Sequence, residues 1–455
     1  MKYSPAITLV LALLFSCAIP ASANDPVSFI REVAPILVQR CLACHGRKDA
    51  ENDYRVDTFA NLQRAGTNDL PPLTAGDPDD SEIMRLISSD DEDERMPKDG
   101  DPLTPAEIGT FRRWIEQGAK FDGPDLKSLL VSILPRPPYP DPPGSYSAPV
   151  PITAIAFHPN GRQLVIGGYH ELTVWDPRDG SLLQRIQNVA RRTYGLAFNS
   201  DGSLLAVSGG DPGRSGEVRL LNPVDGSEVK LLDTSVNVIF DVAFRPDGQK
   251  LAAGFADRTM HVYDVESGME ELAVEHHFDS IMAVNWSLDG SKIISASWDT
   301  TAKVTDAASG ALLSTYEVHR KPVYDIAIQS DGKHVFSSGS DGKIHLWVIE
   351  KSDSKQVAVM GGFGGDVYDL VLVDGQLYSG CRDKSARQHK VDGREQIRSF
   401  ADHSDSVYSL AVHTDSRRLA TGCHDGQVRV WNLDDGNAVT TFTAAPGYAR
   451  ADAIR

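Results

Sequence analysis

The stretch VYDIAIQSDGKHVFSSGSDGKIHLWVI, residues 323–349, decides the fold of most of this chain. It contains three short runs rich in β-branched and aromatic residues, separated by Asp331-Gly332 and Asp341-Gly342. Asp-Gly between such runs predicts antiparallel strands joined by tight turns. A fourth run, QVAVMG at residues 356–361, completes a unit of four strands.

The same unit recurs from residue 150 onward. Its first turn lies at Asn160-Gly161, Asp201-Gly202, Asp247-Gly248, Asp289-Gly290, Asp331-Gly332, Asp374-Gly375 and Asp415-Ser416, at intervals of 41, 46, 42, 42, 43 and 41 residues. A period of this length predicts a repeat architecture in which neighbouring units bury each other's apolar faces. Seven such units are present.

The ends of the third strands carry a second signature: Trp175-Asp176, Tyr263-Asp264, Trp347 and Trp431-Asn432. With the period, these endings resemble WD40 repeats. The resemblance implies an all-β, seven-bladed propeller over residues 150–447, followed by a tail at residues 448–455. No strand from the N-terminal side is available to complete the last blade, so ring closure is expected to depend on blade packing.

Polar residues also repeat in register with the units. His277, His319 and His403 each precede an aspartate by 22 residues. The sets are His277, Ser295 and Asp299; His319, Ser337, Asp341 and Trp347; and His403, Thr421, Asp425 and Trp431. They resemble the hydrogen-bond network of WD40 blades, which implies a structural role. Because they repeat with the blades, they are not interpreted as a hydrolase triad.

Aromatic residues occupy the start of most first strands. The series is Tyr194, Phe240, Met282, Tyr324, Tyr368 and Tyr408, with Thr153 in the first unit. The WD40 resemblance implies that this position faces the rim of the central channel, where aromatic rings favour protein or peptide binding. Ordinary strand packing is the alternative. Trp298, Arg382 and His424 are expected to flank this surface, and Cys381 and Cys423 to be buried thiols too far apart to bridge.

The N-terminal part contains a different motif, CLACH, in which Cys41 and Cys44 are followed directly by His45. A zinc site would need a second pair of Cys or His ligands nearby, and residues 46–130 contain none. A thioredoxin-like pair would follow a strand, whereas a helix with a kink at Pro35 is expected over residues 26–40. The spacing C-x-x-C-H matches covalent attachment of c-type haem, with His45 on the iron.

Two methionines, Met84 and Met96, could supply the sixth iron ligand. Met84 lies among Ile83, Leu86 and Ile87 in a predicted short helix, which favours a core position. Met96 lies in a charged loop, which offers few apolar contacts to a methionine side chain. This favours a role for Met96 as iron ligand. An open or water-bound sixth site is the alternative. A Met/His pair suits electron transfer.

The segments PILVQRCLACHG, GDPDDSEIMRLI, RMPKDG and LTPAEIGTFRRWIEQGA together resemble the mono-haem cytochrome c domain of planctomycete-type secreted proteins. The resemblance covers about residues 27–121. It implies a small all-α domain over residues 24–125 with one covalent haem c on Cys41 and Cys44 and axial ligands His45 and Met96. Lys98 departs from the usual double proline after the methionine. Thr104, Pro105 and Glu107 predict the capped start of the domain's last long helix.

The first 23 residues have one lysine, an apolar run and Ala21-Ser22-Ala23, which predict a signal peptide and an exported, periplasmic protein. Lipidation at Cys17, which would anchor the chain to a membrane, is the alternative. Residues 126–149 are predicted to be a proline-rich linker, because residues 135–151 contain eight prolines.

The formal net charge of −18 argues against nucleic acid as a partner. Residues 24–127 carry 22 acidic and 13 basic side chains, and the segment SSDDEDER, residues 88–95, adjoins Met96. A well-solvated surface would explain these charges. Alternatively, the acidic segment steers a basic redox partner toward the haem.

These features favour an exported electron carrier whose propeller docks a partner protein or complex, and they give no sign of a catalytic site. Three interpretations stay open: the electron carrier, an enzyme and a sensor. A cytochrome domain ahead of a propeller is also the layout of haem-d1 nitrite reductases, although those have eight blades. A haem sensor on an interaction scaffold is the third.

Overall fold

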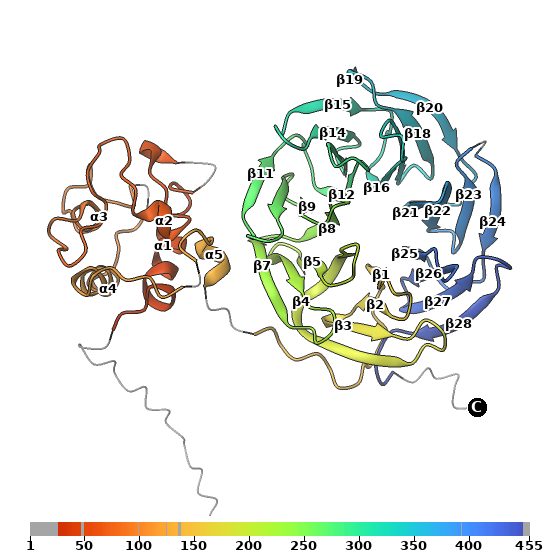
Figure 1. Cartoon of the computed structure of the whole chain (residues 1–455), viewed down its shortest axis with the longest axis horizontal. Helices are drawn as coiled ribbons and strands as arrows, with labels where there is room; N and C mark the ends of the chain where they lie inside the picture. Colours follow the sequence, from red (N-terminus) through yellow and green to blue (C-terminus); the bar gives the residue numbers. More distant parts are fainter. Residues whose placement is uncertain are drawn as a thin grey trace, which may run out of the picture. The chain divides into compact units, whose positions relative to one another are not determined.

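The computed structural model describes residues 26–46, 50–98, 100–123, 125–134, 138–392 and 394–448. The predicted signal peptide, with Cys17, and all but the first residue of the predicted tail lie outside these ranges. The chain divides into two compact units after Pro135, one helical and one made of strands (Figure 1). Within the described ranges, no helix combines the length and apolarity needed to span a bilayer.

The first unit is helical. It contains a π-helical turn (Phe29–Val33), α1 (Ala34–Arg40), a 3-10 turn (Glu51–Asp53), α2 (Phe59–Leu62), α3 (Glu82–Ile87), α4 (Pro105–Glu116) and α5 (Leu130–Ile133). Aromatic rings form its core: Phe29 lies edge-on to Phe59 at 4.8 Å between ring centroids and 5.3 Å from Trp114. Each of the three side chains is at most 2% exposed.

The start of the first helix differs from the prediction. It begins at Phe29 instead of residue 26, because Ser28 caps it by accepting a hydrogen bond from the Arg31 amide at 3.2 Å. The kink expected at Pro35 corresponds to the junction between the π-helical turn and α1, which begins at Ala34. The start of α4 is confirmed, since Thr104 and Glu107 form a reciprocal capping box.

The predicted linker over residues 126–149 is wrong at both ends. At one end, α5 packs into the helical core: Leu130 is fully buried and its amide donates to the Asp57 carbonyl at 2.8 Å. At the other end, Tyr146 is 7% exposed and its hydroxyl donates to Glu171 at 2.7 Å. Because prolines dominate the composition of this segment, its sequence gives little indication that Leu130 and Tyr146 are buried.

The second unit is a propeller of seven four-stranded antiparallel blades (Figure 1), as the repeats predict. Blade one comprises β1 (Ile155–Phe157), β2 (Leu164–Gly167), β3 (Tyr169–Trp175) and the first half of β4 (Leu182–Phe198), and blade two comprises the second half of β4 with β5 (Leu205–Asp211), β6 (Ser215–Leu221) and β7 (Glu228–Ser235). Blade three comprises β8 (Ile239–Phe244), β9 (Lys250–Phe255), β10 (Met260–Asp264) and β11 (Glu270–Val274). Because β4 is continuous, it is the outer strand of one blade and the inner strand of the next.

The remaining blades follow the same order. Blade four comprises β12 (Ile281–Trp286), β13 (Lys292–Ser297), β14 (Ala302–Asp306) and β15 (Leu312–Tyr316), which pairs with the short β19 (Ser352–Asp353). Blade five comprises β16 (Val323–Ile328), β17 (His334–Gly339), β18 (Ile344–Val348) and β20 (Lys355–Met360). Blade six comprises β21 (Val367–Val373), β22 (Gln376–Cys381), β23 (Ala386–Lys390) and β24 (Gln396–Phe400), and blade seven β25 (Val407–His413), β26 (Arg418–Cys423), β27 (Gln427–Asn432) and β28 (Ala438–Thr443).

The ring closes between blades seven and one without exchange of a strand. The Tyr146 amide donates to the Pro446 carbonyl at 3.0 Å, and the Ile152 amide donates to the Cys423 carbonyl at 3.1 Å. Trp175 of blade one stacks on Phe442 of blade seven at 4.7 Å. Packing therefore closes the ring, with added backbone hydrogen bonds from the segment before β1.

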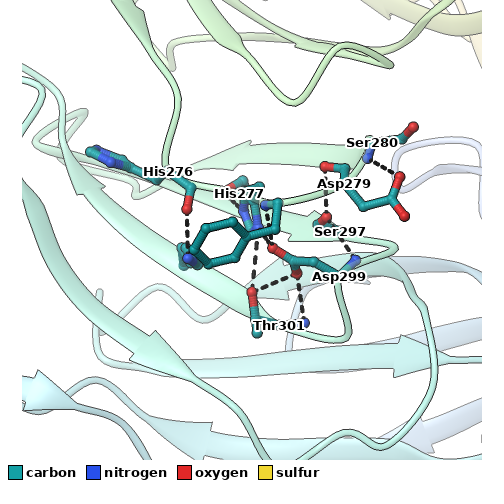
Figure 2. A network of polar contacts seen from close by, with 10 residues as sticks. His276, His277, Asp279, Ser280, Ser297, Asp299 and Thr301 are labelled. Carbon is teal, nitrogen blue, oxygen red and sulfur yellow. Dashed lines mark hydrogen bonds and ion pairs between the residues drawn. The ribbon is translucent and has the colours of Figure 1, made fainter.

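The repeated histidines are hydrogen-bonded to the Ser or Thr residue of their blades, and His403 Nδ1 also lies 3.2 Å from the Lys384 carbonyl of blade six. In blade four, His277 lies 2.8 Å from Asp299 through Nδ1 and 2.7 Å from the Ser295 hydroxyl through Nε2, and Thr301 also donates to Asp299 (Figure 2). In blade five, His319 lies 2.8 Å from the Ser337 hydroxyl, which accepts from the Trp347 indole N–H at 3.1 Å. In blade seven, His403 and Trp431 share the Thr421 hydroxyl in the same way.

Ser337→Ala is expected to lower the free energy of unfolding by about 2 to 4 kcal/mol. The Ser337 side chain is fully buried, and its loss leaves both His319 Nε2 and the Trp347 N–H without a partner. Chemical denaturation measures the change. Ser330→Ala, at an exposed position of the same blade, is the control and should change stability by less than about 0.5 kcal/mol. Equal effects of the two substitutions would contradict a structural role for the network.

Candidate functional site

A cavity of about 280 Å³ lies in the helical unit. Cys41, His45 and Met96, three residues of the predicted haem site, line it. The rest of its lining is mixed: Val56, Leu70, Pro72, Ile83, Leu86 and Ile87 are apolar, whereas Asn52, Tyr54, Thr67, Asn68 and Glu82 carry polar groups. The structure thus brings a thiol, an imidazole and a thioether to one cavity from positions up to 55 residues apart in sequence.

The imidazole of His45 is held in one orientation. Its Nδ1 lies 3.0 Å from the Tyr54 carbonyl oxygen, and the Val56 amide donates to the His45 carbonyl at 2.9 Å. A carbonyl can only accept, so Nδ1 carries the proton and Nε2 is left with a lone pair for a metal. The Tyr54 ring lies edge-on to the imidazole at 5.5 Å, and burial raises the pKa of its phenol, which therefore stays neutral.

The two motif cysteines lie on the turn that follows α1. The Cys41 amide donates to the Leu37 carbonyl at 3.0 Å, and the His45 amide donates to the Cys41 carbonyl at 3.0 Å, so the turn carries Cys41 and His45 to the same wall. Both cysteines are free thiols; Cys41 is partly buried, and Cys44 is exposed and does not line the cavity. Burial raises the pKa of Cys41 to about 12, so its thiol stays protonated at neutral pH.

The two methionines occupy different environments. Met96 lies in the cavity wall, and its amide donates to the Leu86 carbonyl at 3.0 Å, which ties its loop to α3. Met84 is 2% exposed within the helical core and does not line the cavity. An imidazole nitrogen, a thioether sulfur and the Cys41 thiol line the cavity, and the Cys44 thiol lies on the same turn as Cys41; these are the groups that a c-type haem uses, so the residues present fit it.

The propeller has a second cavity, of about 320 Å³, lined by residues of the inner strands. Every member of the predicted aromatic series lines it, from Thr153 and Tyr194 to Tyr408. Trp298, Arg382 and His424 are exposed and do not line it, although the His424 ring lies 5.3 Å from that of Tyr408. Cys381 and Cys423 are buried free thiols.

Sequence reasoning missed three carboxylates in this cavity, those of Asp241, Asp325 and Asp369. Each follows an aromatic residue of the series and accepts a hydrogen bond from the next blade: from the Val284 amide at 2.9 Å, the Leu370 amide at 2.6 Å and the Leu410 amide at 2.5 Å, respectively. Burial raises the pKa of Asp241 to about 7 and the pKa of each of the other two above its usual value. The repeated pair aromatic-Asp in IFD, VYD and VYD was the signal available in the sequence.

Asp241→Asn is expected to remove a pH-dependent part of the propeller's stability. Because the native pKa of about 7 exceeds the ordinary value of 3.8, the native state holds a proton between about pH 7 and pH 4 that the unfolded chain lacks. The Asp241 contribution therefore grows as pH falls, by up to about 1.4 kcal/mol per pH unit, and is lost as pH rises through 7.

Chemical denaturation of both proteins at pH 8, 7, 6 and 5 measures this contribution. Burial lowers the pKa of His277, His319 and His403, which act with the opposite sign in both proteins and cancel in the comparison. The free energy of unfolding of the wild type minus that of Asp241→Asn should increase from pH 8 to pH 5. A difference that stays constant or narrows would contradict the assignment.

Comparisons with known proteins agree with both units. The family described as Planctomycete cytochrome C matches residues 41–100, and the family described as WD domain, G-beta repeat matches residues 141–176, 226–264, 270–306, 310–348 and 394–432. Similar proteins include Protein FIZZY-RELATED 2 of Arabidopsis thaliana, 30% identical over 121 residues, which are 26% of this chain and 25% of that protein.

Autophagy-related protein 16 of Arabidopsis thaliana is 27% identical over 236 residues, 50% of this chain and 46% of that protein. Coronin-7 of Rattus norvegicus is 34% identical over 104 residues, 21% of this chain and 11% of that protein. The chain spans less than half the length of each of these three relatives. Fold, cavity and family matches together identify the chain as a planctomycete-type cytochrome c domain fused to a seven-bladed WD40 propeller.

Proposed function

We propose that this protein is an exported electron carrier with one covalent haem c, and that its propeller docks the redox partner. Cys41 and Cys44 would form the thioethers, and His45 and Met96 would ligate the iron. The observation that carries the proposal is the single cavity whose wall contains Cys41, His45 and Met96. When bound there, haem supplies reversible one-electron oxidation and reduction of iron.

The residues of the cavity favour electron transfer over oxygen or nitrite chemistry. The Tyr54 carbonyl fixes the His45 tautomer, so that Nε2 is the ligand atom. Met96 as a second iron ligand would leave no free coordination position and would stabilise the ferrous state.

The acidic segment before Met96 gives this domain a surface suited to a basic partner. Residues 90–94, Asp-Asp-Glu-Asp-Glu, are all exposed. Among these five side chains, Glu94 is paired with Arg85 at 2.7 Å. A negative field next to the proposed ligand would raise the encounter rate with a basic protein, more strongly at low ionic strength.

The predicted signal peptide supports export to the periplasm, where c-type haem is attached. Protein produced in the periplasm with a haem-maturation system should undergo repeated one-electron reduction and oxidation with an unchanged spectrum. Its oxidation by a cationic one-electron reagent, the cobalt(III) tris-phenanthroline ion, should slow as salt is added, while oxidation by anionic ferricyanide should accelerate.

Asp91→Asn/Glu92→Gln/Asp93→Asn should weaken both salt effects. Asp201→Asn/Asp225→Asn/Asp435→Asn, at exposed turns of the propeller, is the matched control and should leave them nearly unchanged. Catalytic consumption of nitrite by the reduced protein would instead show an enzyme. Tight binding of carbon monoxide by the wild-type protein would favour a sensor.

A further inference from the structure

The propeller channel is built to present aromatic rings. Six inner strands, β4, β8, β12, β16, β21 and β25, each have a register irregularity at the same position. The residues at these irregularities are Tyr194, Phe240, Met282, Tyr324, Tyr368 and Tyr408, and all six line the channel cavity. A bulge re-aims a side chain out of regular alternation, and its repetition in six blades directs five aromatic rings to one space.

These rings form two groups around the cavity. Tyr194 and Phe240 lie 5.3 Å apart between ring centroids; Tyr368 lies 5.5 Å from Tyr324 and 4.6 Å from Tyr408. All five are partly exposed instead of buried, so their surfaces are open to the cavity. The face of an aromatic ring carries partial negative charge and attracts cations.

Carboxylates line the same cavity. Asp241, Asp325 and Asp369 are partly exposed to solvent, although they lie on the innermost strands. Their hydrogen bonds come from backbone amides, and Asp325 and Asp369 also bond to each other. In the described ranges, no lysine or arginine side chain is recorded as bonded to any of the three. Within the described ranges, the cavity therefore holds three carboxyl groups that no basic side chain of this chain pairs with, and a bound cation would favour their ionised form.

We propose that this cavity binds the cationic side chain, lysine or arginine, of a partner polypeptide that docks on the propeller. The inference rests on the docking role proposed above. A basic side chain has an apolar stem for the aromatic collar and a charged head for the carboxylates. A bare divalent cation needs several oxygen ligands close together, and among the described residues the ligand oxygens of Asp241, Asp325 and Asp369 do not all lie within 4.8 Å of one another.

Two further charged residues lie close enough to act on rings that line the cavity. Burial raises the pKa of Tyr324 and of Tyr368, and the charges of Asp366 and Arg382 act on both rings with opposite signs. Arg382 is exposed, and it offsets Asp366 without contacting the three channel carboxylates in the described structure.

Isothermal titration of the full-length, haem-loaded protein tests the inference. The probes are acetyl-Gly-Ser-Lys-Ser-Gly-amide, the same peptide with arginine, and the same peptide with norleucine, which keeps the apolar stem but has no charge. The lysine or arginine peptide should bind at least tenfold more tightly than the norleucine peptide. Added salt should weaken that binding.

Tyr368→Leu and Asp325→Asn should each weaken binding of the basic peptide at least tenfold, and thermal melting shows whether each variant is folded. Asp374→Asn is the matched control: it lies on a turn of the same blade as Tyr368, and its left-handed backbone, with φ of 49°, accepts asparagine. If Asp325→Asn does not fold, Phe240→Leu takes its place and should weaken binding to the same degree.

Equal affinity for the norleucine peptide, or unchanged binding in Tyr368→Leu, would overturn the inference. Calcium chloride alone is the second probe, and tight calcium binding that displaces the basic peptide would show a metal site instead. The haem spectrum of the same sample separates the two proposals. Absence of peptide binding beside an intact, reversible haem spectrum overturns the channel site and leaves the electron-carrier function standing.

Discussion

Protein with both Cys41→Ala and Cys44→Ala is expected to contain no covalently bound haem, whereas the wild-type chain should carry one. The C-x-x-C-H motif occurs once in the 455 residues, and Cys41 and His45 lie together in the wall of one cavity. Each single variant keeps one thiol and should retain at most one thioether. Intact mass of periplasmic protein, measured after denaturation, distinguishes these outcomes.

Cys381→Ala/Cys423→Ala is the matched control. Both thiols are buried in the propeller, and their loss should leave the haem content at one per chain. Haem that survives denaturation of the Cys41→Ala/Cys44→Ala protein would contradict the attachment site. Wild-type protein without haem, under conditions in which the maturation system loads another c-type cytochrome, would contradict the haem assignment as a whole.

Met96→Ala is expected to lower the reduction potential and to open the iron to carbon monoxide. Removal of the thioether takes away a ligand that favours ferrous iron, and alanine cannot reach the metal. The fall should be on the order of a tenth of a volt, within the roughly 0.8 V range that axial ligands span. Potentiometric titration measures the fall, and spectra under carbon monoxide show the open site.

Met84→Ala is the control that separates ligation from packing. Met84 is 2% exposed in the helical core, so its loss should destabilise the domain by about 2 to 5 kcal/mol and leave the iron's ligands in place. The opposite pattern, with carbon monoxide binding in Met84→Ala and not in Met96→Ala, would reverse the assignment of the two methionines.

The propeller could be predicted from the sequence because its signals are local. Each Asn-Gly or Asp-Gly turn fixes a hairpin, and the 41- to 46-residue period orders the blades without any knowledge of long-range contacts. The capping box of α4 is equally local, since Thr104 and Glu107 bond to each other's backbone. The spacing of Cys41, Cys44 and His45 is local as well: it predicts haem attachment, and the structure places Cys41 and His45 in the wall of one cavity.

Contacts between distant residues could not be predicted in this way. The Tyr54 carbonyl that orients His45 is a backbone group, and any residue at that position could supply it. Leu130 and Tyr146 anchor the ends of a segment whose prolines indicated a free linker. Pro26 predicted a helix that begins at residue 26, whereas Ser28 is the N-cap and the helix begins at Phe29.

The channel carboxylates were missed because strand periodicity gives the wrong orientation for them. Regular alternation would place Tyr368 and Asp369 on opposite faces of β21, whereas the bulge at Tyr368 lets both line the cavity. The same bulge occurs in five other inner strands. Its residue type varies, with Phe240 and Met282 in place of tyrosine, so the sequence does not show where the bulges lie.

His45 and Met96 are proposed to ligate the iron of an electron carrier together. The absorption spectrum of the oxidised wild-type protein near the near-infrared edge tests it most directly, because a methionine sulfur on ferric iron gives a weak sulfur-to-iron band there. The account predicts that this band is present in wild type and in Met84→Ala, is absent in Met96→Ala, and that reduced wild type does not bind carbon monoxide. A wild-type protein that lacks the band and binds carbon monoxide readily would contradict the account and favour a sensor or an enzyme.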